Sequence, residues 1–264
     1  MSESNLLHVN NLCASYGDNH VIRGAEFSLQ HGEFAALLGL NGSGKTTLLR
    51  AVCGLKQVNS GFCFVNGVDS LELNEKLRAR LMSYIPQRHS IVYDIAVLDV
   101  VLMGFNANMS MLQTPGKRER KLAEEALERI GIQVLRNENF LNLSEGQKQL
   151  VILARTLVQN SPIMLLDEPD SALDFVNRHM VLSKIRGVIK KGKYCGLITL
   201  HDPNCALQYC DKLLLLSEGR ICDVVNVDSD LSDVKKGLGR IYGNIDILKL
   251  RGHYVMVGGE DFEE

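Results

Sequence analysis

The sequence has no hydrophobic run long enough to cross a membrane, and its beginning is polar. A transmembrane helix needs about 18 or more consecutive apolar residues, and no stretch of the chain comes near that length. The first residues, MSESNLLHVN, also lack the basic and then apolar arrangement of a secretory signal peptide. We therefore expect this chain to stay on the cytoplasmic side of the membrane.

The chain also has little net charge. Its formal charge is −2, and the basic run KRERK at 117–121 is soon followed by two glutamates. Nucleic-acid-binding domains usually carry a clear excess of basic residues on one face. We expect no nucleic-acid partner, and we interpret the basic run as the solvated face of a helix.

Nothing in the sequence indicates a disulfide framework or a cysteine-rich metal site. The seven cysteines are odd in number, scattered, and never spaced as C-x-x-C, so we expect buried, reduced thiols. Internal repeats and low-complexity runs are also missing. What is present, 264 residues with 45% apolar and 23% charged side chains, is typical of a globular protein with a large core. One domain that carries an insertion is the simplest organisation.

The clearest motif is GLNGSGKTT at 39–47, which fits the phosphate-binding pattern G-x-x-x-x-G-K-[ST]. It follows the apolar run FAALLG and precedes TTLLRAVCGL, which is the strand, loop and helix context that this motif requires. The glycines allow backbone amides to point at phosphates, Lys45 adds a positive charge, and the Thr46 hydroxyl can ligate Mg²⁺. The candidate nucleotide-binding residues here are Asn41, Gly42, Ser43, Gly44, Lys45, Thr46 and Thr47. A Rossmann dinucleotide loop fits less well, because the glycine spacing differs and a lysine follows.

The order of the elements predicts an α/β fold. LLHVNNLCASY and VIRGAEFSLQ, joined by GDNH, predict an antiparallel hairpin before the phosphate loop. Residues 88–160 change to helical patterns, including a helix after 117 with Leu122, Ala123, Ala126, Leu127 and Ile130 on one face. The apolar runs PIMLLDEP, KYCGLITLHD and DKLLLLSEGRIC then predict a parallel sheet covered on both faces. Residues 226–264 contain two further strand-like runs, IDILKL and HYVMVGG.

Two acids, Asp167 and Glu168, end the buried strand IMLL. Carboxylates at the carboxyl end of a strand in an open α/β sheet lie at the ligand-binding edge, so they can face the phosphate loop. Asp167 suits Mg²⁺, which prefers oxygen ligands. Glu168 is the natural group to orient and deprotonate a water molecule in line with the γ-phosphate.

Six segments in sequence order resemble the nucleotide-binding subunit of ATP-binding-cassette (ABC) transporters, over about residues 6–225. They are GLNGSGKT, YIPQ, LSEGQ, IMLLDEP, SALD and LHD. The resemblance implies a P-loop NTPase core of the RecA-like type, with an antiparallel β subdomain and an inserted helical subdomain at about 88–160. It also implies an ABC ATPase domain at 1–225, followed by a β-containing extension at 226–264.

The resemblance assigns roles to individual residues. Tyr16 is similar to the aromatic residue that stacks on adenine, and Gln87 to the glutamine that senses Mg²⁺ and the membrane partner. His201 is similar to the histidine that holds the γ-phosphate, and Asp174 to the aspartate that communicates between two sites. ATP and Mg²⁺ are the implied ligands, with Glu168, His201 and Gln87 catalytic and Thr46, Gln87 and Asp167 near the metal.

The segment LNLSEGQKQL at 141–150 reads as a helix start capped by Ser144. In ABC proteins this signature helix closes over ATP held by a second copy, so Ser144, Gly146 and Gln147 are expected at the ATP of a partner chain. The usual pattern resembles LSGGQ, whereas this chain has Glu145 at the first glycine position. We expect the Glu145 carboxylate to point along the first turn, where it interacts favourably with the helix dipole.

Within the family, RARLMSYIPQ, DVVLMG and ALDFVNRH most resemble ATPases that energise import of ferric siderophores, haem and vitamin B12. The implied partners are a second copy of the chain, an integral membrane permease and, indirectly, an external substrate-binding protein. The implied location is the cytoplasmic face of a bacterial or archaeal membrane. FNANMS after MG departs from that subfamily. An ATPase for zinc or manganese import, or a soluble ABC ATPase outside transport, is therefore the alternative.

Overall fold

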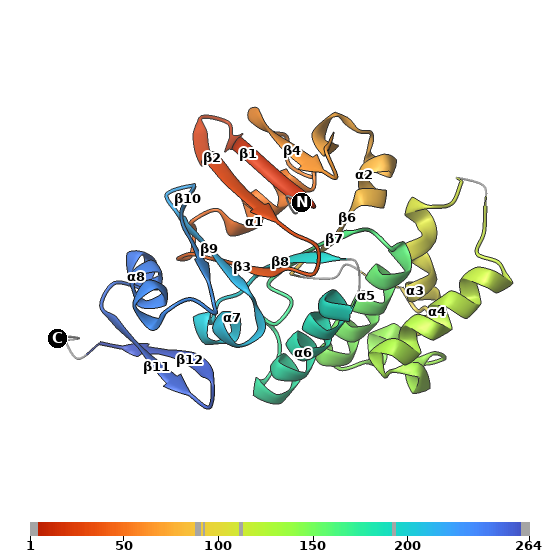
Figure 1. Cartoon of the computed structure of the whole chain (residues 1–264). Helices are drawn as coiled ribbons and strands as arrows, with labels where there is room; N and C mark the ends of the chain where they lie inside the picture. Colours follow the sequence, from red (N-terminus) through yellow and green to blue (C-terminus); the bar gives the residue numbers. More distant parts are fainter. Residues whose placement is uncertain (1–4, 88–90, 92, 111–112, 192–193, 260–264) are drawn as a thin grey trace.

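The computed structural model describes residues 5–87, 91, 93–110, 113–191 and 194–259. Two larger sheets and a set of helices form the body of the molecule, and a small hairpin lies at its C-terminal end (Figure 1). The predicted start of the helical insertion at residue 88 lies outside the described residues.

The central sheet has six strands in the order β10-β9-β3-β8-β7-β6. The strands are β3 (Phe34–Leu38), β6 (Met82–Ile85), β7 (Ile163–Asp167), β8 (Cys195–Thr199), β9 (Lys212–Ser217) and β10 (Arg220–Asn226). The first five run parallel, and every residue of β3, β7 and β8 is buried, as their apolar runs predict.

The predicted parallel arrangement holds from β6 to β9, and the sheet ends at one edge with β10, which runs antiparallel to β9. The two strands are joined directly by Glu218 and Gly219, both with positive φ (49° and 77°). A two-residue turn with this backbone conformation closes a hairpin, so the chain returns beside β9 without a helical crossover.

The predicted antiparallel hairpin is confirmed and belongs to a second sheet, ordered β2-β1-β4-β5. Its strands are β1 (Leu7–Tyr16), β2 (Asn19–Leu29), β4 (Ser60–Val65) and β5 (Val68–Asp69). The hairpin turn is shorter than GDNH, because Asn19 already pairs with Tyr16 and His20 with Ser15.

The central sheet separates two hydrophobic cores. Phe34, Ala36 and Leu38 of β3 face one core, and Ala35 and Leu37 face the other, as the alternation of a strand requires. The first core contains residues from the helices below the sheet in Figure 1, including α6 (Phe175–Lys191) and α7 (Pro203–Tyr209). The second core is closed by the antiparallel sheet and α1 (Lys45–Val52).

The inserted helical region contains α3 (Val97–Leu102), α4 (Lys117–Ile130) and α5 (Glu145–Gln159), with short 3₁₀ turns η2 (Met103–Ala107), η3 (Gln133–Leu135) and η4 (Phe140–Asn142). On α4 the predicted residues Ala123, Ala126, Leu127 and Ile130 are buried. Leu122 is not: its exposed fraction is 39%. The buried stripe follows the i, i+3, i+4, i+7 pattern from Ala123, and Leu122 is rotated about 100° away from its start.

The remaining elements are η1 (Ser70–Glu72), α2 (Glu75–Leu81), α8 (Leu231–Tyr242), β11 (Ile245–Leu250) and β12 (His253–Gly258). The two strands predicted near the end are confirmed as the β11–β12 hairpin. The side chain of Asn204 on α7 binds β12 of this hairpin. It accepts from the Met256 backbone N–H at 2.7 Å and donates to the Met256 carbonyl at 3.2 Å. Helix α8 precedes the hairpin and was not predicted.

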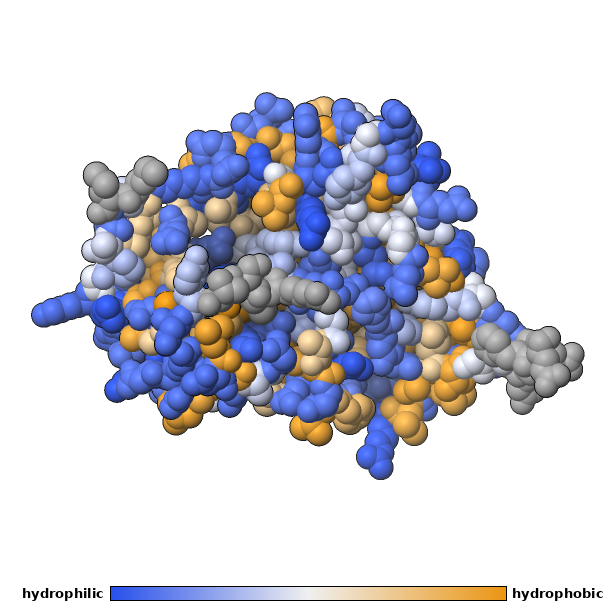
Figure 2. Space-filling view, turned by 180° about the vertical axis from the view of Figure 1, so that it is seen from behind, coloured by the Kyte–Doolittle hydropathy of each residue, from blue (hydrophilic) through white to orange (hydrophobic). Residues whose placement is uncertain are grey.

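Among the described residues, no helix has the length and apolar character that a membrane span requires. Figure 2 shows one face of the molecule, where hydrophilic side chains dominate and hydrophobic ones form small separate groups. The basic run at 117–121 belongs to α4 and is largely exposed, as predicted for a solvated helix face.

Candidate active site

The phosphate loop, Gly39 to Thr47, leaves the carboxyl end of β3 and enters α1. Gly42 and Gly44 have φ values of 80° and 104°, which favour glycine. At Gly39, a Cβ atom would lie 2.4 Å from the Leu216 carbonyl oxygen. The first turn of α1 holds no acidic residue, so its free backbone N–H groups can donate hydrogen bonds to an anion.

Lys45 is buried in this loop, with an exposed fraction of 6%. Its Nζ donates to the carbonyl oxygens of Gly39 at 2.9 Å and Leu40 at 3.3 Å. Burial lowers the pKa of Lys45, while the nearby carboxylates of Glu168 and Asp167 act to raise it. The ammonium group is thus held by its own loop, where it can exchange carbonyl oxygens for those of a phosphate.

A hollow of about 460 Å³ lies beside the loop. It is lined by Gly42 and Ser43, by the start of β2 and by the β9–β10 turn. Tyr16, at the end of β1, is 49% exposed, and Lys56 Nζ lies 4.5 Å from the centroid of its ring. An exposed aromatic ring close to the start of β2 is available for stacking on a base.

The structure brings Asp167 together with Thr46, as the sequence predicts. Thr46 Oγ1 donates to Asp167 Oδ1 at 3.0 Å. Two further hydroxyls that sequence reasoning missed also donate to this carboxylate: Thr199 Oγ1 to Oδ1 at 3.0 Å, and the Tyr84 hydroxyl to Oδ2 at 2.9 Å. Thr199 ends β8, and Tyr84, the first residue of YIPQ, lies in β6. The sequence motifs gave neither residue a role.

Glu168, the residue after Asp167, has an unusual backbone conformation, with φ at 47°. Its backbone N–H donates to Thr199 Oγ1 at 2.8 Å. Its carboxylate oxygen Oε2 lies 2.6 Å from Gln87 Nε2 and 2.8 Å from His201 Nε2. The three residues predicted to be catalytic are therefore in direct contact, although they lie on three separate segments. Non-glycine residues held at positive φ often mark functional sites.

The donor set suits a hard cation that shares its coordination with a ligand. Thr46 and Asp167 offer oxygen atoms beside the phosphate loop. Within the described part of the chain, no cluster of three or more His, Cys, Asp or Glu side chains could hold a metal by itself. A metal here would need phosphate oxygens as further ligands, which is how Mg²⁺ usually binds with nucleotides.

The signature segment, Leu143 to Gln147, starts α5. Ser144 Oγ accepts from the Gln147 backbone N–H at 3.3 Å, and Gln147 Oε1 accepts from the Ser144 N–H at 3.0 Å, which forms a capping box. At Gly146, a Cβ atom would lie 3.1 Å from Asn177 Oδ1. Among the described residues, no hydrogen bond joins this segment to the phosphate loop of the same chain.

Glu145 behaves as expected from the helix dipole. Its carboxylate accepts from Lys148 Nζ at 2.8 Å, within the first turn of α5. Asp174 caps the start of α6, where it accepts from the Asn177 backbone N–H at 2.8 Å and from the Asn177 side chain at 2.9 Å. These bonds lower the pKa of Asp174.

A protein-family model and several known proteins match this chain. The family model described as ABC transporter matches residues 22–171. The "Probable iron chelatin transport ATP-binding protein" of Helicobacter pylori is 34% identical over 82% of this chain and 85% of its own length. The hemin import ATP-binding protein HmuV of Vibrio cholerae is 34% identical over 80% of this chain and 82% of its own. The manganese transport system ATP-binding protein MntB of Halalkalibacterium halodurans is 31% identical over 83% and 88%.

A solved structure supports the same relationship. It is described as "An inward-facing conformation of a putative metal-chelate type ABC transporter", and its chain superposes with a TM-score of 0.81 at 26% identity. The match covers 96% of this chain and 98% of the other. The region after residue 225 therefore falls largely within the common fold.

Proposed function

Because this chain belongs to the ABC transporter family and is one of its ATPases, we propose that it energises a membrane importer through a pair of ATP-binding subunits. The observation that carries the proposal is the convergence of Lys45, Thr46, Asp167, Glu168 and His201 at the carboxyl ends of β3, β7 and β8. The relative named for hemin import supports import as the direction of transport.

The chemistry assigns the phosphate loop to ATP binding. The amides at the start of α1 and the Lys45 ammonium hold the β- and γ-phosphates. Thr46 and Asp167 would hold Mg²⁺, which would supply positive charge to neutralise the phosphates. The Thr46 hydroxyl hydrogen already points to Asp167 Oδ1, so a lone pair of its oxygen stays free for the ion.

Glu168 is the group that takes a proton from the attacking water. Both contacts from Gln87 and His201 fall on its Oε2, and no hydrogen bond to Oε1 is found within the described residues. Oε1 therefore remains available as the base, while the two neighbours fix the carboxylate plane. His201 is half-exposed and can also reach a γ-phosphate brought in from solvent.

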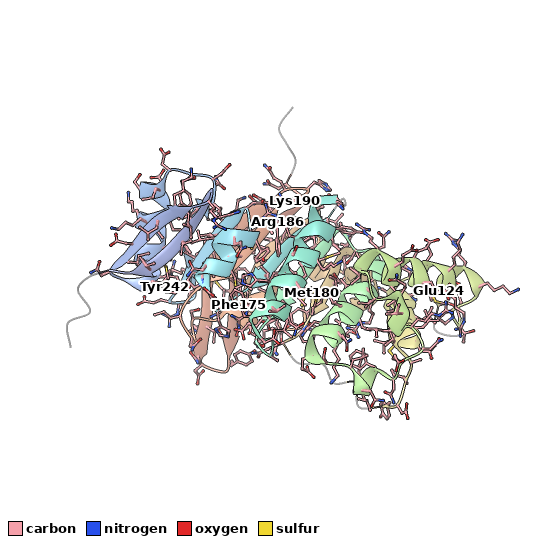
Figure 3. All side chains as sticks on the ribbon, turned by 90° about the horizontal axis from the view of Figure 1, so that it is seen from below. Glu124, Phe175, Met180, Arg186, Lys190 and Tyr242 are labelled. Atoms are coloured by element: carbon pink, nitrogen blue, oxygen red, sulfur yellow. The ribbon has the colours of Figure 1, made fainter. Side chains whose placement is uncertain are left out.

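The second copy completes the site. Ser144 and the amides at the start of α5 form an anion-binding surface. Among the described residues, this surface makes no hydrogen bond to the phosphate loop of its own chain. It therefore suits the γ-phosphate of an ATP that a partner chain holds. Asp174 is exposed beside it, and Phe175 and Val176 are 72% and 73% exposed. Figure 3 shows Phe175 at the beginning of α6, away from Arg186 and Lys190 near its other end. A partner chain would cover these apolar side chains.

The site does not identify the cargo. We favour iron chelates, such as siderophore complexes and haem, or cobalamin; the relatives named for iron chelatin transport and hemin import support the iron cargo. A separate permease and an external substrate-binding protein are proposed from the sequence resemblance. Manganese or another metal ion is the alternative, because the manganese ATPase is nearly as similar. The chain would then act at the cytoplasmic face of the membrane.

The test is to purify the chain by affinity from detergent-solubilised native membranes and to identify its companions by mass spectrometry. A polytopic permease at equal stoichiometry is the expected result, and the permease would indicate the substrate class. Recovery of only soluble proteins or nucleic acid, with no membrane protein, would contradict the proposal.

A further inference from the structure

Tyr84 is the first residue of the YIPQ segment, but the role implied for that segment concerns Gln87 alone. It lies in β6, which pairs in parallel with β7, and it stands opposite Leu165, two residues before Asp167. Its side chain reaches along the neighbouring strand, and the hydroxyl donates to Asp167 Oδ2 at 2.9 Å. Tyr84 is thus tied to the carboxylate predicted to bind Mg²⁺.

The two oxygens of Asp167 are held by different residues. Oδ1 accepts from Thr46 and Thr199, whereas Oδ2 accepts from Tyr84, which is its one hydrogen-bond donor among the described residues. Asp167 is 1% exposed, so water is a poor substitute for a missing donor. A buried carboxylate oxygen without a partner is costly, and the group would turn to find another.

Arg50 orients the Tyr84 hydroxyl. Arg50 lies on α1, one turn after Thr46, and its Nε approaches the Tyr84 oxygen at 3.4 Å. An arginine can only donate, so the hydroxyl accepts from Arg50 and gives its own hydrogen to Asp167. Helix α1 is therefore linked to Asp167 by two sets of hydrogen bonds: directly through Thr46, and indirectly through Arg50 and Tyr84.

We infer that Tyr84, oriented by Arg50, is a positioning residue that fixes the Asp167 carboxylate for Mg²⁺ bound with ATP. This inference rests on the proposed role of Asp167 and Thr46 at the metal. Without the Tyr84 hydroxyl, Oδ2 loses its donor and the carboxylate can rotate about its Cβ–Cγ bond. The Thr46 hydroxyl, which bonds the same carboxylate, then loses its fixed orientation as well.

The experiment measures nucleotide binding, so that turnover does not enter. In a Glu168→Gln parent, a fluorescent ATP analogue is titrated without divalent ions and then at increasing Mg²⁺. Tyr84→Phe is compared with the parent, because it removes only the hydroxyl. Tyr194→Phe is the matched control, since Tyr194 donates to Asn160 at 3.2 Å outside the site. Arg50→Gln tests the contribution of the hydrogen bond from Arg50 to the Tyr84 hydroxyl.

We expect Tyr84→Phe to raise the Mg²⁺ concentration for half-maximal binding roughly tenfold, as outer-shell substitutions at metal sites do. Binding without Mg²⁺ should match the parent, and Arg50→Gln should show a smaller shift in the same direction. Tyr194→Phe should show none.

Two results would overturn the inference. One is an unchanged Mg²⁺ requirement in Tyr84→Phe. The other is an equal loss of binding with and without Mg²⁺, which would make the role of Tyr84 purely structural. A parent protein whose ATP binding does not respond to Mg²⁺ at all would instead contradict the proposed metal site, so the two failures are distinguishable.

Discussion

The Gln87 side chain lies 2.6 Å from the carboxylate of Glu168, and this contact joins the start of the inserted region to the core. Gln87 follows β6, where the chain leaves the central sheet for the inserted helices, and Glu168 follows β7 within the core. A shift of the inserted helices at this junction would move the amide away from the carboxylate. This hydrogen bond therefore links the start of the inserted region to the carboxylate proposed as the base.

Glu168→Gln should remove turnover and keep ATP binding. Glutamine has the shape of glutamate but cannot take a proton from water, so the hydrolysis rate should fall by about a hundredfold or more. The ATP-bound pair should then accumulate, because hydrolysis no longer opens it. Size-exclusion chromatography with light scattering at saturating ATP and Mg²⁺ measures this. A variant that stays monomeric under these conditions would rule out the two-chain site.

Much of this site was predictable, because its residues lie in motifs whose chemistry fixes their spacing. The loop at 39–47 and the acids after IMLL both follow buried strands, and parallel strands bring their carboxyl ends to one edge. Tyr84 and Thr199 were missed because the sequence around a strand hydroxyl does not show what that hydroxyl binds, even for Tyr84 within YIPQ. Their importance arises only from the register of β6, β7 and β8.

Helix α8 was missed for a different reason. Its sequence contains Gly237 and Gly239, each of which lowers helix propensity by about 1 kcal/mol relative to alanine. Packing overrides this cost, since a Cβ atom at Gly237 would lie 2.3 Å from Val225 Cγ2. The glycine that weakens the local pattern is thus required where α8 meets β10. Such a contact between distant segments is not visible in a local window of sequence.

Lys45→Ala should weaken nucleotide binding itself. The lysine supplies a charged hydrogen bond to phosphate, which is worth about 2 kcal/mol, or roughly thirtyfold in affinity. Isothermal titration with ATP and with ADP measures the loss. The loss should be present with and without Mg²⁺, in contrast to that of Tyr84→Phe. Normal ATPase activity in this variant would remove the phosphate loop from the mechanism.

Asp170 and Asp174 should affect stability with opposite pH dependence. Burial raises the pKa of Asp170, despite a contact of 3.4 Å with Arg178, whereas bonds from Asn177 lower the pKa of Asp174. Folded Asp170 binds its proton at higher pH than the unfolded chain does. The wild type should therefore gain stability relative to Asp170→Asn as the pH falls toward 3.8, the ordinary value of the group.

Asp174→Asn is the matched control for this titration. Folded Asp174 holds its proton less tightly than the unfolded chain, so the wild type should lose stability relative to this variant as the pH falls through and below 3.8. Urea unfolding from neutral pH to well below 3.8 gives both differences in the free energy of unfolding. If the stability difference from wild type changed with pH in the same direction for both variants, the raised pKa assigned to buried Asp170 would be wrong.

Glu145→Gly, which restores the usual signature pattern, should leave the ATPase rate within about threefold, since an exposed ion pair such as that with Lys148 contributes little energy. The Glu145 carboxylate is already engaged along the helix, so it does not repel phosphate strongly. The variant should lose up to about 1 kcal/mol of stability, because glycine is a poor helix former. Glu145→Gln separates charge from helix propensity and should keep both rate and stability. A tenfold rise in the rate of Glu145→Gly and Glu145→Gln, with unchanged assembly, would show instead that the carboxylate opposes the γ-phosphate of the partner site.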